Sequence, residues 1–446
     1  MWRISKEKAQ QDWKRKITVF AGQINAFVER GLTHGWDKAG KEPRLGKVSR
    51  LVPHVLAAVR EANAKGDFAK LRHDWPPAHA PFIDMLDENG QSIPEVCLLE
   101  DGRIIARIGA AYEAGYVIEI QGDQATRVPG VEFFGFSGDR KYFASAGQDG
   151  IRITDGWGGE AVKFFNYPSG KEGVPEAFAA SVPEMNQPPA IEKIIPYDGG
   201  ERVLLVTGAG IFVLTSTQAI RILPGRQDIE EHFTWMAKEY PNDEPSYSLD
   251  MGHAAISPDE KWIAIGSQDS VHIVLDARRL EPVAIANPES SYPHHAVFSP
   301  ASDFVAFNSC HFYNGTTIGI DLKDIADSKG KDAQEIETHT VLEEDARVYA
   351  AVASGADEFI IGDAYGYLRA IDRKGRFKWQ HFIGSSVSAI DIAPDGKTLI
   401  ASTSAGFLCI IQLHADARPD YQIGTADHHE LRRWIFWKSE ERPLIW

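Results

Sequence analysis

Four side chains suited to metal or acid–base chemistry occupy the same position in four successive copies of a repeated strand pattern. His253 and His295 begin equivalent strands, with Glu192 in the copy before them and Tyr349 in the copy after. Imidazole and carboxylate groups brought together can bind a metal ion or an anion. Because a third strong ligand is not evident, we predict no metal and no cofactor, and expect these residues to line the mouth of a central channel.

The common motifs of nucleophilic, metal and nucleotide chemistry are missing from the sequence. It has no G-x-S-x-G elbow, no HExxH pair, no P-loop and no dinucleotide-binding glycine motif, and residues 135–138 (Gly-Phe-Ser-Gly) predict a strand that ends in a hairpin turn. Cys97, Cys310 and Cys409 lack the CxxC spacing of a zinc site and are expected to be reduced, mostly buried thiols. We therefore expect a protein that is not an enzyme.

One segment, residues 225–250, combines acidic and aromatic side chains. Acid with exposed aromatic rings is typical of a surface that binds a basic protein. We therefore predict a partner-binding element made of Asp228, Glu230, Glu231, Trp235, Glu239, Tyr240, Asp243 and Glu244. The alternative is a solvated helix whose Phe233 and Trp235 tuck under the neighbouring strands.

A strand pattern that repeats seven times must position these residues. Each copy has an apolar strand, a tight turn with Asp or Gly, a second apolar strand, a small polar turn and a third strand; the first turns centre on residues 101, 139, 198, 259, 303, 357 and 395. Such self-similarity predicts a mainly β fold, a seven-bladed β-propeller over residues 91–425. The long spacers at 168–190 and 224–250 follow a fourth strand, which places both on the face that carries the turns between second and third strands.

Those turns between second and third strands supply further candidates for partner binding. They are short and polar, as tight hairpins require. The candidates in them are Asp149, Asp269, Asp363 and Tyr365. Because loops on a rigid scaffold usually carry function, we expect all four on the same partner-binding face.

The ends of the third strands point to a family. They read Thr154-Asp155, Leu275-Asp276, Ile320-Asp321 and Ile371-Asp372. These repeats resemble divergent bacterial WD40-like and YVTN-type propellers, whose third strand ends in Trp-Asp. This chain keeps the aspartate in four copies, replaces the tryptophan by smaller residues, and has one Gly-His pair, Gly252-His253. The resemblance covers about three quarters of the chain and implies a fold more firmly than a function.

The two ends of the chain fall outside the repeat. Residues 1–90 predict a helical arm and a connector, with apolar stripes over 17–28, ended by Gly31, and over 51–59, ended by Gly66. Residues 426–446 hold three tryptophans and are expected to close the ring as an outer strand of the last blade or to pack on the N-terminal helices. A partner-binding tail is the alternative.

Charge separates the arm from the rest. Residues 1–72 hold 16 Lys and Arg against 7 Asp and Glu, while the remainder holds 31 against 56, and the whole chain of 446 residues has a net charge of −16. A negative surface disfavours nucleic acid and favours a basic protein, although acidity that only aids solubility is the alternative. No apolar run is long enough for a membrane span and no secretory signal is evident, so a cytoplasmic protein without membrane contact, expected to be a monomer, is predicted.

Together these features predict a non-enzymatic protein-binding propeller. Its most concrete form is an acidic inhibitor of immunity type that covers the active site of a basic toxin or effector. The alternatives are a scaffold subunit of a multiprotein complex and, less favoured, an enzyme with a metal in the channel, similar to propeller lactonases and lyases.

Overall fold

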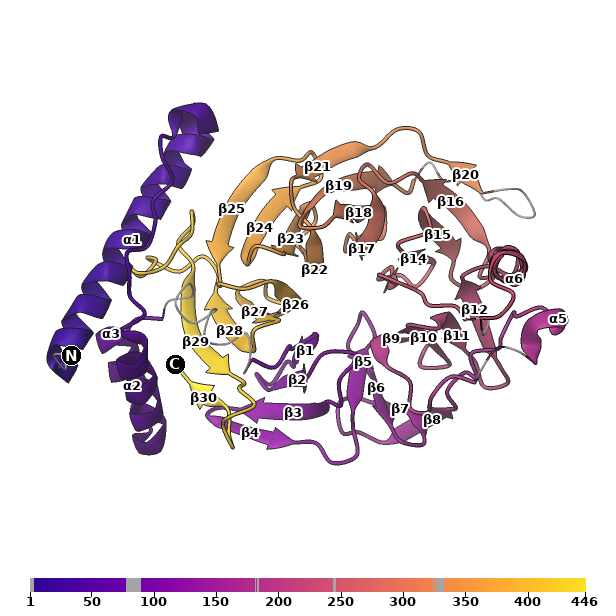
Figure 1. Cartoon of the computed structure of the whole chain (residues 1–446), viewed down its shortest axis with the longest axis horizontal. Coiled ribbons are helices and arrows are strands. Elements are labelled where there is room, and N and C mark those ends of the chain that lie inside the picture. Colours follow the sequence, from indigo (N-terminus) through magenta and orange to yellow (C-terminus); the bar gives the residue numbers. More distant parts are fainter. Residues whose placement is uncertain are drawn as a thin grey trace.

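Seven sheets stand in a ring around a central opening, and a helical arm lies along one side of the ring (Figure 1). The computed structural model describes residues 4–77, 90–180, 182, 184–243, 246–323, 325 and 333–446. Each sheet is one blade, with its first strand at the centre and later strands toward the outside. The predicted mainly β, seven-bladed β-propeller is therefore confirmed.

The first three blades have four strands each. Blade 1 contains β1 (Glu95–Leu98), β2 (Ile104–Ile108), β3 (Tyr116–Gln121) and β4 (Gln124–Arg127). Blade 2 contains β5 (Phe133–Phe136), β6 (Tyr142–Gly147), β7 (Gly150–Asp155) and β8 (Ala161–Phe165). Blade 3 contains β9 (Ile191–Tyr197), β10 (Arg202–Thr207), β11 (Gly210–Leu214) and β12 (Ala219–Leu223).

Blades 4 and 7 add a short fifth strand. Blade 4 contains β13 (His253–Ile256), β14 (Trp262–Gly266), β15 (His272–Asp276), β16 (Pro282–Ala286) and β20 (Gln334–Glu335), which runs parallel to β16. Blade 5 contains β17 (Tyr292–Phe298), β18 (Phe304–His311), β19 (Asn314–Asp321) and β21 (Thr340–Glu344). Blade 6 contains β22 (Val348–Ser354), β23 (Glu358–Asp363), β24 (Tyr367–Asp372) and β25 (Phe377–Phe382). Blade 7 contains β26 (Val387–Ile392), β27 (Thr398–Thr403), β28 (Phe407–Gln412), β29 (His429–Ile435) and β30 (Leu444–Ile445).

The second strands are apolar along their whole length because each blade has a neighbour on both faces. Strand β2 is buried at every position, and β10 at all but the first. Buried side chains gather between adjacent blades; one such layer joins Phe133 and Ile153 of blade 2 to Ile194 and Phe212 of blade 3. The core is thus a series of apolar layers between blades, as expected for strands covered on both sides.

Up-and-down strands place the loops of each blade alternately on two faces. We define the insert face as the one formed by the turns between second and third strands and by the connections between blades. It carries α5 (Glu176–Ala179) and α6 (Arg226–Glu239), which lie in the connections after β8 and β12. The opposite face is formed by the turns between first and second strands and between third and fourth strands.

Several turns between first and second strands are tied by a serine. In blade 4, Ser257 Oγ donates to Asp259 Oδ1 at 2.8 Å and accepts from Trp262 N at 2.9 Å. The same arrangement recurs in blades 2 and 5, at Ser137, Asp139 and Tyr142 and at Ser299, Asp303 and Phe304. The serines and aspartates of the repeat therefore hold hairpins together.

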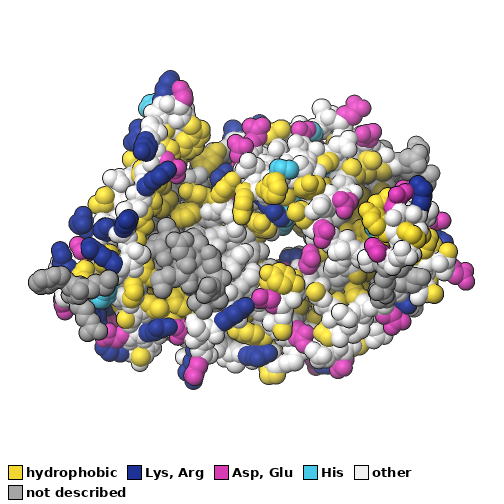
Figure 2. Space-filling view, in the orientation of Figure 1, with side chains coloured by type: hydrophobic (Ala, Val, Ile, Leu, Met, Phe, Trp, Pro, Cys, Tyr) yellow, Lys and Arg dark blue, Asp and Glu magenta, His cyan; other side chains and the backbone are white. Residues whose placement is uncertain are grey.

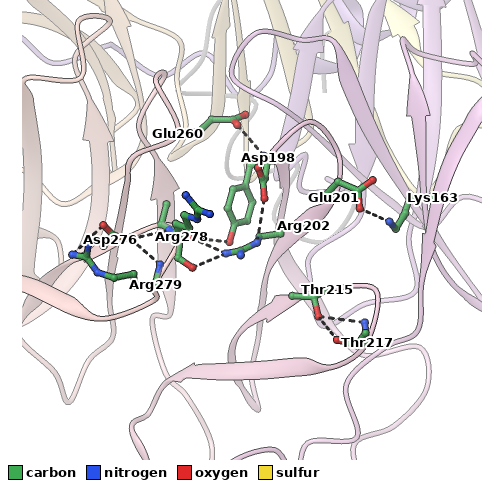
Figure 3. A network of polar contacts seen from close by, with 12 residues as sticks. Lys163, Asp198, Glu201, Arg202, Thr215, Thr217, Glu260, Asp276, Arg278 and Arg279 are labelled. Atoms are coloured by element: carbon green, nitrogen blue, oxygen red, sulfur yellow. Dashed lines mark hydrogen bonds and ion pairs between the residues drawn. The ribbon is translucent and has the colours of Figure 1, made fainter. Parts of the chain in front are cut away.

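Polar contacts also join neighbouring blades on the opposite face (Figure 3). Arg202 of blade 3 donates to the carbonyl oxygens of Ala277 at 3.1 Å and Arg278 at 3.0 Å, both in the segment that follows β15. Lys163 of β8 pairs with Glu201 of blade 3. These bonds fix blade 3 against blades 2 and 4, in addition to the apolar layers between them.

The helical arm contains α1 (Lys6–His34), η1 (Trp36–Lys38), α2 (Val52–Lys65) and α3 (Phe68–Asp74). The prediction that Gly31 ends the first helix is wrong. Gly31 lies inside α1, where a Cβ would be 2.3 Å from the Trp36 ring, and the helix ends at Gly35 with φ of +92°. Gly66 ends α2 in the left-handed region, as predicted. Within the described residues, no helix is both long and apolar enough to cross a membrane.

The arm packs on the last blade. Trp13, Val55 and Leu71 lie in one buried cluster with residues of blades 6 and 7. Asn63 exchanges two hydrogen bonds with the backbone of Ile445, at 2.8 and 2.9 Å. Strand β29 is the outer partner of β28, so the C-terminal segment both completes blade 7 and contacts the arm. Lys and Arg side chains gather along α1, whereas Asp and Glu lie around the ring (Figure 2).

Candidate functional site

The inner side of α6 anchors it to the propeller. Ile229 and Phe233 are buried, and the Phe233 ring lies 5.5 Å from that of Phe178 on α5. At the start of the helix, Asp228 Oδ2 accepts a hydrogen bond from Gly225 N at 3.0 Å, which satisfies a free backbone donor. The two helices of the insert face are therefore held together by an apolar contact, and α6 keeps a fixed outer surface.

The outer side of α6 presents the acidic and aromatic residues to solvent. Trp235 is 51% exposed, Tyr240 is 49% exposed, and their ring centroids lie 5.3 Å apart. Around them the exposed acidic side chains are Asp228, Glu230, Glu231, Glu239 and Asp243. Phe233 is buried, against Phe178 of α5, whereas Trp235 is not buried. Glu244, the remaining candidate of this segment, lies outside the described residues.

A second aromatic group lies on the insert face at blades 5 and 6. Phe312 and Tyr313, in the turn between β18 and β19, are 73% and 62% exposed. Tyr365, in the equivalent turn of blade 6, donates from its hydroxyl to Asn314 Oδ1 at 2.8 Å and has its ring 6.3 Å from Tyr313. Tyr112, in the turn of blade 1, is exposed as well.

Sequence reasoning named Tyr365 and missed Phe312, Tyr313 and Tyr112. The available signal was their position. Rings in a turn between second and third strands lie on the same face as α6, and a hairpin turn rarely needs an aromatic residue for its own geometry.

The three acidic candidates in the turns differ in their exposure to solvent. Asp149 and Asp269 are exposed on the insert face. Asp363 is fully buried, so its expected place on the binding surface is wrong. Its Oδ1 accepts from the backbone of Tyr365 and Tyr367, each at 2.9 Å, because the hairpin needs an acceptor at that point. Burial also raises the pKa of this carboxyl.

The two histidines predicted to lie together at the channel mouth differ in what surrounds them, although each lies in an inner strand and His253 acts electrostatically on His295. His295 lines a central cavity. His253 is 7% exposed and is not one of the residues that line this cavity. Gly266, opposite His253 in the sheet, has no side chain, and the imidazole fills that space; a Cβ on Gly266 would lie 2.6 Å from the ring. Burial lowers the pKa of His253 to about 4, and that of His295 well below its usual value.

The other two channel candidates lie toward the insert face. Glu192 is near the start of β9 and exposed, and partial removal from water beside Asp250 raises its pKa. The Tyr349 ring packs against the Arg347 guanidinium at 4.7 Å and the His294 ring at 5.0 Å. In the part of the chain that the structure describes, no group of three or more His, Cys, Asp or Glu side chains is arranged to hold a metal ion.

No protein-family model matches this sequence, and no curated protein matches it. The resemblance to WD40-like repeats therefore stays a prediction. Function is inferred from the surface itself, whose most distinctive part is the insert face.

Proposed function

We propose that this chain is a cytoplasmic, WD40-like, non-enzymatic propeller that binds a basic protein on its insert face. One observation carries the proposal: the exposed aromatic side chains gather on that face. Of the nine strongly exposed aromatic residues in the described chain, six lie there: Tyr112, Trp235, Tyr240, Phe312, Tyr313 and Tyr365. Exposed tyrosine and tryptophan are the residues most enriched at binding hot spots, and rings left in water are otherwise unfavourable.

Charge supports a basic partner. The segment from Arg226 to Asp250 holds seven acidic residues against two basic ones. Carboxylates around an aromatic centre steer a positively charged protein and disfavour acidic competitors. The concrete form that we propose is an inhibitor of immunity type, whose carboxylates and rings cover the active site of a basic toxin or effector.

Matched charge reversals test the proposal. Glu230→Lys, Glu231→Lys and Glu239→Lys together change the charge of the insert face and leave the Asp228 cap of α6 in place. The control carries Glu100→Lys, Glu160→Lys and Asp416→Lys, three exposed carboxylates in loops of the opposite face, and has the same change in net charge. Each protein is used as bait for affinity capture from the native cell, followed by quantitative mass spectrometry.

The expected result is one basic protein captured at near-equal stoichiometry by the wild type and the control and lost with the insert-face variant. Its capture should weaken as salt rises, because exposed charges are screened. Equal capture by all three baits would remove α6 from the binding site and contradict the proposal.

A scaffold is the second candidate, because the insert face carries two separate aromatic groups. One is Trp235 with Tyr240 on α6, and the other is Phe312 with Tyr313 and Tyr365. A scaffold predicts two partners that are lost independently when each group is changed to alanine. A single inhibitor target predicts that both changes weaken the same complex.

A further inference from the structure

The centre of the ring contains a cavity of about 950 Å³ that reaches from the middle of the channel to the opposite face. Its rim is formed by turns between first and second strands, with Pro258, Pro300 and Pro394 among the lining residues. It lies away from α6 and the exposed aromatic rings. Its volume falls within the range of small-molecule sites.

The lining changes character with depth. Going inward from the rim, the inner strands present the partly exposed apolar side chains Phe136, Ile195, Val297, Val352 and Ile390. Further in, toward the insert-face ends of the same strands, lie Glu95, Lys193 and His295. A wide apolar collar above a few polar groups is the usual layout of a site for a mostly apolar ligand with one polar end.

Lys193 is the cation that remains accessible in this cavity. Its Nζ pairs with Glu95 Oε2 at 2.7 Å, yet the Lys193 side chain is 39% exposed whereas that of Glu95 is 5% exposed. An ammonium has three donors, and Glu95 uses one of them. The other cation, Arg140, is already held by Asp391 and by two backbone carbonyl oxygens.

His295 adds a second polar group with free hydrogen-bonding capacity. Within the described part of the chain it makes no hydrogen bond to another residue, although it lines the cavity beside the polar end. Burial keeps its pKa well below the usual value, so the ring is neutral and offers one N–H donor. Two donors from different blades, Lys193 and His295, therefore lie at the inner end of an apolar cavity.

We propose that this cavity binds a small apolar carboxylic acid, with the carboxylate on Lys193 and His295 and the hydrocarbon body against the apolar collar. A single negative charge fits better than two, because Glu95, Asp391 and Glu260 already outnumber Lys193 and Arg140 in the lining. The site is independent of the insert face.

Octanoate and its uncharged isostere octanamide test the site by isothermal titration calorimetry on the full chain at fixed ionic strength. The expected result is one octanoate per chain, bound at least about tenfold more tightly than octanamide, since an ion pair with a charged donor adds this much. Lys193→Gln should weaken octanoate about tenfold and leave octanamide unchanged. Glu95→Gln should strengthen octanoate, because it removes the competing carboxylate.

Two further variants locate the site. Val352→Trp fills the collar and should abolish binding of both probes, while Lys163→Gln, on the outer strand of blade 2, should change neither. The thermal unfolding of each variant is recorded alongside. Absence of octanoate binding, equal affinity for both probes, or binding that persists in Val352→Trp would each overturn the proposal. The comparison of octanoate with octanamide on the wild-type protein tests the proposal even if Lys193→Gln does not fold.

Discussion

Gly135 lies where the inner strands of blades 2 and 3 approach closely. A Cβ at this position would be 1.8 Å from the carbonyl oxygen of Ile194 and 2.7 Å from its carbon. Only glycine allows the two backbones this separation, because the neighbouring group is main chain and cannot turn aside. The Gly-Phe-Ser-Gly stretch is thus explained by packing: Gly135 gives room and Ser137 ties the turn.

Gly135→Ala should lower the free energy of unfolding by about 3 kcal/mol, because one of the two strands must shift. Urea unfolding monitored by tryptophan fluorescence measures the change. The control is Gly22→Ala on α1, where nothing lies within 4 Å and the free energy should rise by about 0.5–1 kcal/mol. A Gly135→Ala protein as stable as the wild type would show that the two strands can move apart without loss of stability.

Buried histidines make the fold sensitive to acid. Burial lowers the pKa of His253, His381 and His428 to about 4, against about 6.5 in an unfolded chain. Above pH 6.5 both states are neutral at these rings. Below it the unfolded chain takes up protons that the folded chain does not, so stability is lost as the pH falls from about 6.5 to about 4.

For His381 alone, this linkage amounts to a loss of about 2 kcal/mol between pH 6.5 and pH 5.0. His381→Gln should therefore make the free energy of unfolding less dependent on pH over this interval. Parallel pH curves for His381→Gln and the wild type would contradict the assignment of acid sensitivity to buried rings.

At the scale of elements, a serine ties the turn between first and second strands in blades 2, 4 and 5. Ser257→Ala removes a donor to Asp259 and leaves Trp262 N without its acceptor. The expected loss is about 1–2 kcal/mol, measured by urea unfolding. Ser216→Ala, at an exposed serine in the turn before β12, should be neutral. A neutral Ser257→Ala would mean that the strands alone set the hairpin.

Strands and turns were predictable because their signals are local. The sequence repeats apolar runs and turns with Asp or Gly in a fixed order. The number of blades, and the face on which each loop lies, follow from this pattern. The first helix was located, but its end was not, because the reason that Gly31 is glycine is the Trp36 ring packed over it. A contact between a helix and the segment after it carries no periodic signal.

The candidate site was predictable where composition alone decides. The exposed acidic and aromatic side chains of α6 were predicted from the sequence. The burial of Asp363 and His253 was not, because the exposure of each side chain depends on the residues opposite it in the sheet. The Lys193–Glu95 pair joins blades 3 and 1 across 98 positions of sequence. The spacing of the two residues in the sequence does not predict this pair, because only the closed ring of blades brings them together.

At the scale of the whole molecule, the ring closes between blade 7 and blade 1 through a buried ion pair. Asp391 of β26 accepts from Leu98 N of blade 1 at 2.6 Å and pairs with Arg140 of blade 2 at 2.6 Å. Arg140 also donates to the carbonyl oxygens of Leu98 and Ile392. One guanidinium thus links the last blade to the first two.

Arg140→Met should lower the free energy of unfolding by about 3–5 kcal/mol, because it leaves Asp391 buried without its partner. Arg140→Met with Asp391→Asn should recover part of this loss, since the amide is neutral and still accepts from Leu98 N. Thermal and urea unfolding of both variants measure the effect. If Arg140→Met were as stable as the wild type, apolar contacts alone would hold blade 7 against blade 1.

The contacts between the arm and the last blade also fix an order of events. Arg72 donates to the carbonyl oxygen of Glu430 at 2.7 Å, 358 positions later in the chain, and Asn63 meets Ile445 at a separation of 382. A ribosome makes α1, α2 and α3 first and the surface that covers their apolar stripe last. Through the synthesis of the first five blades the arm therefore lacks the surfaces of blades 6 and 7 on which it packs, and its contacts with Glu430 and Ile445 form only after blade 7 has been made.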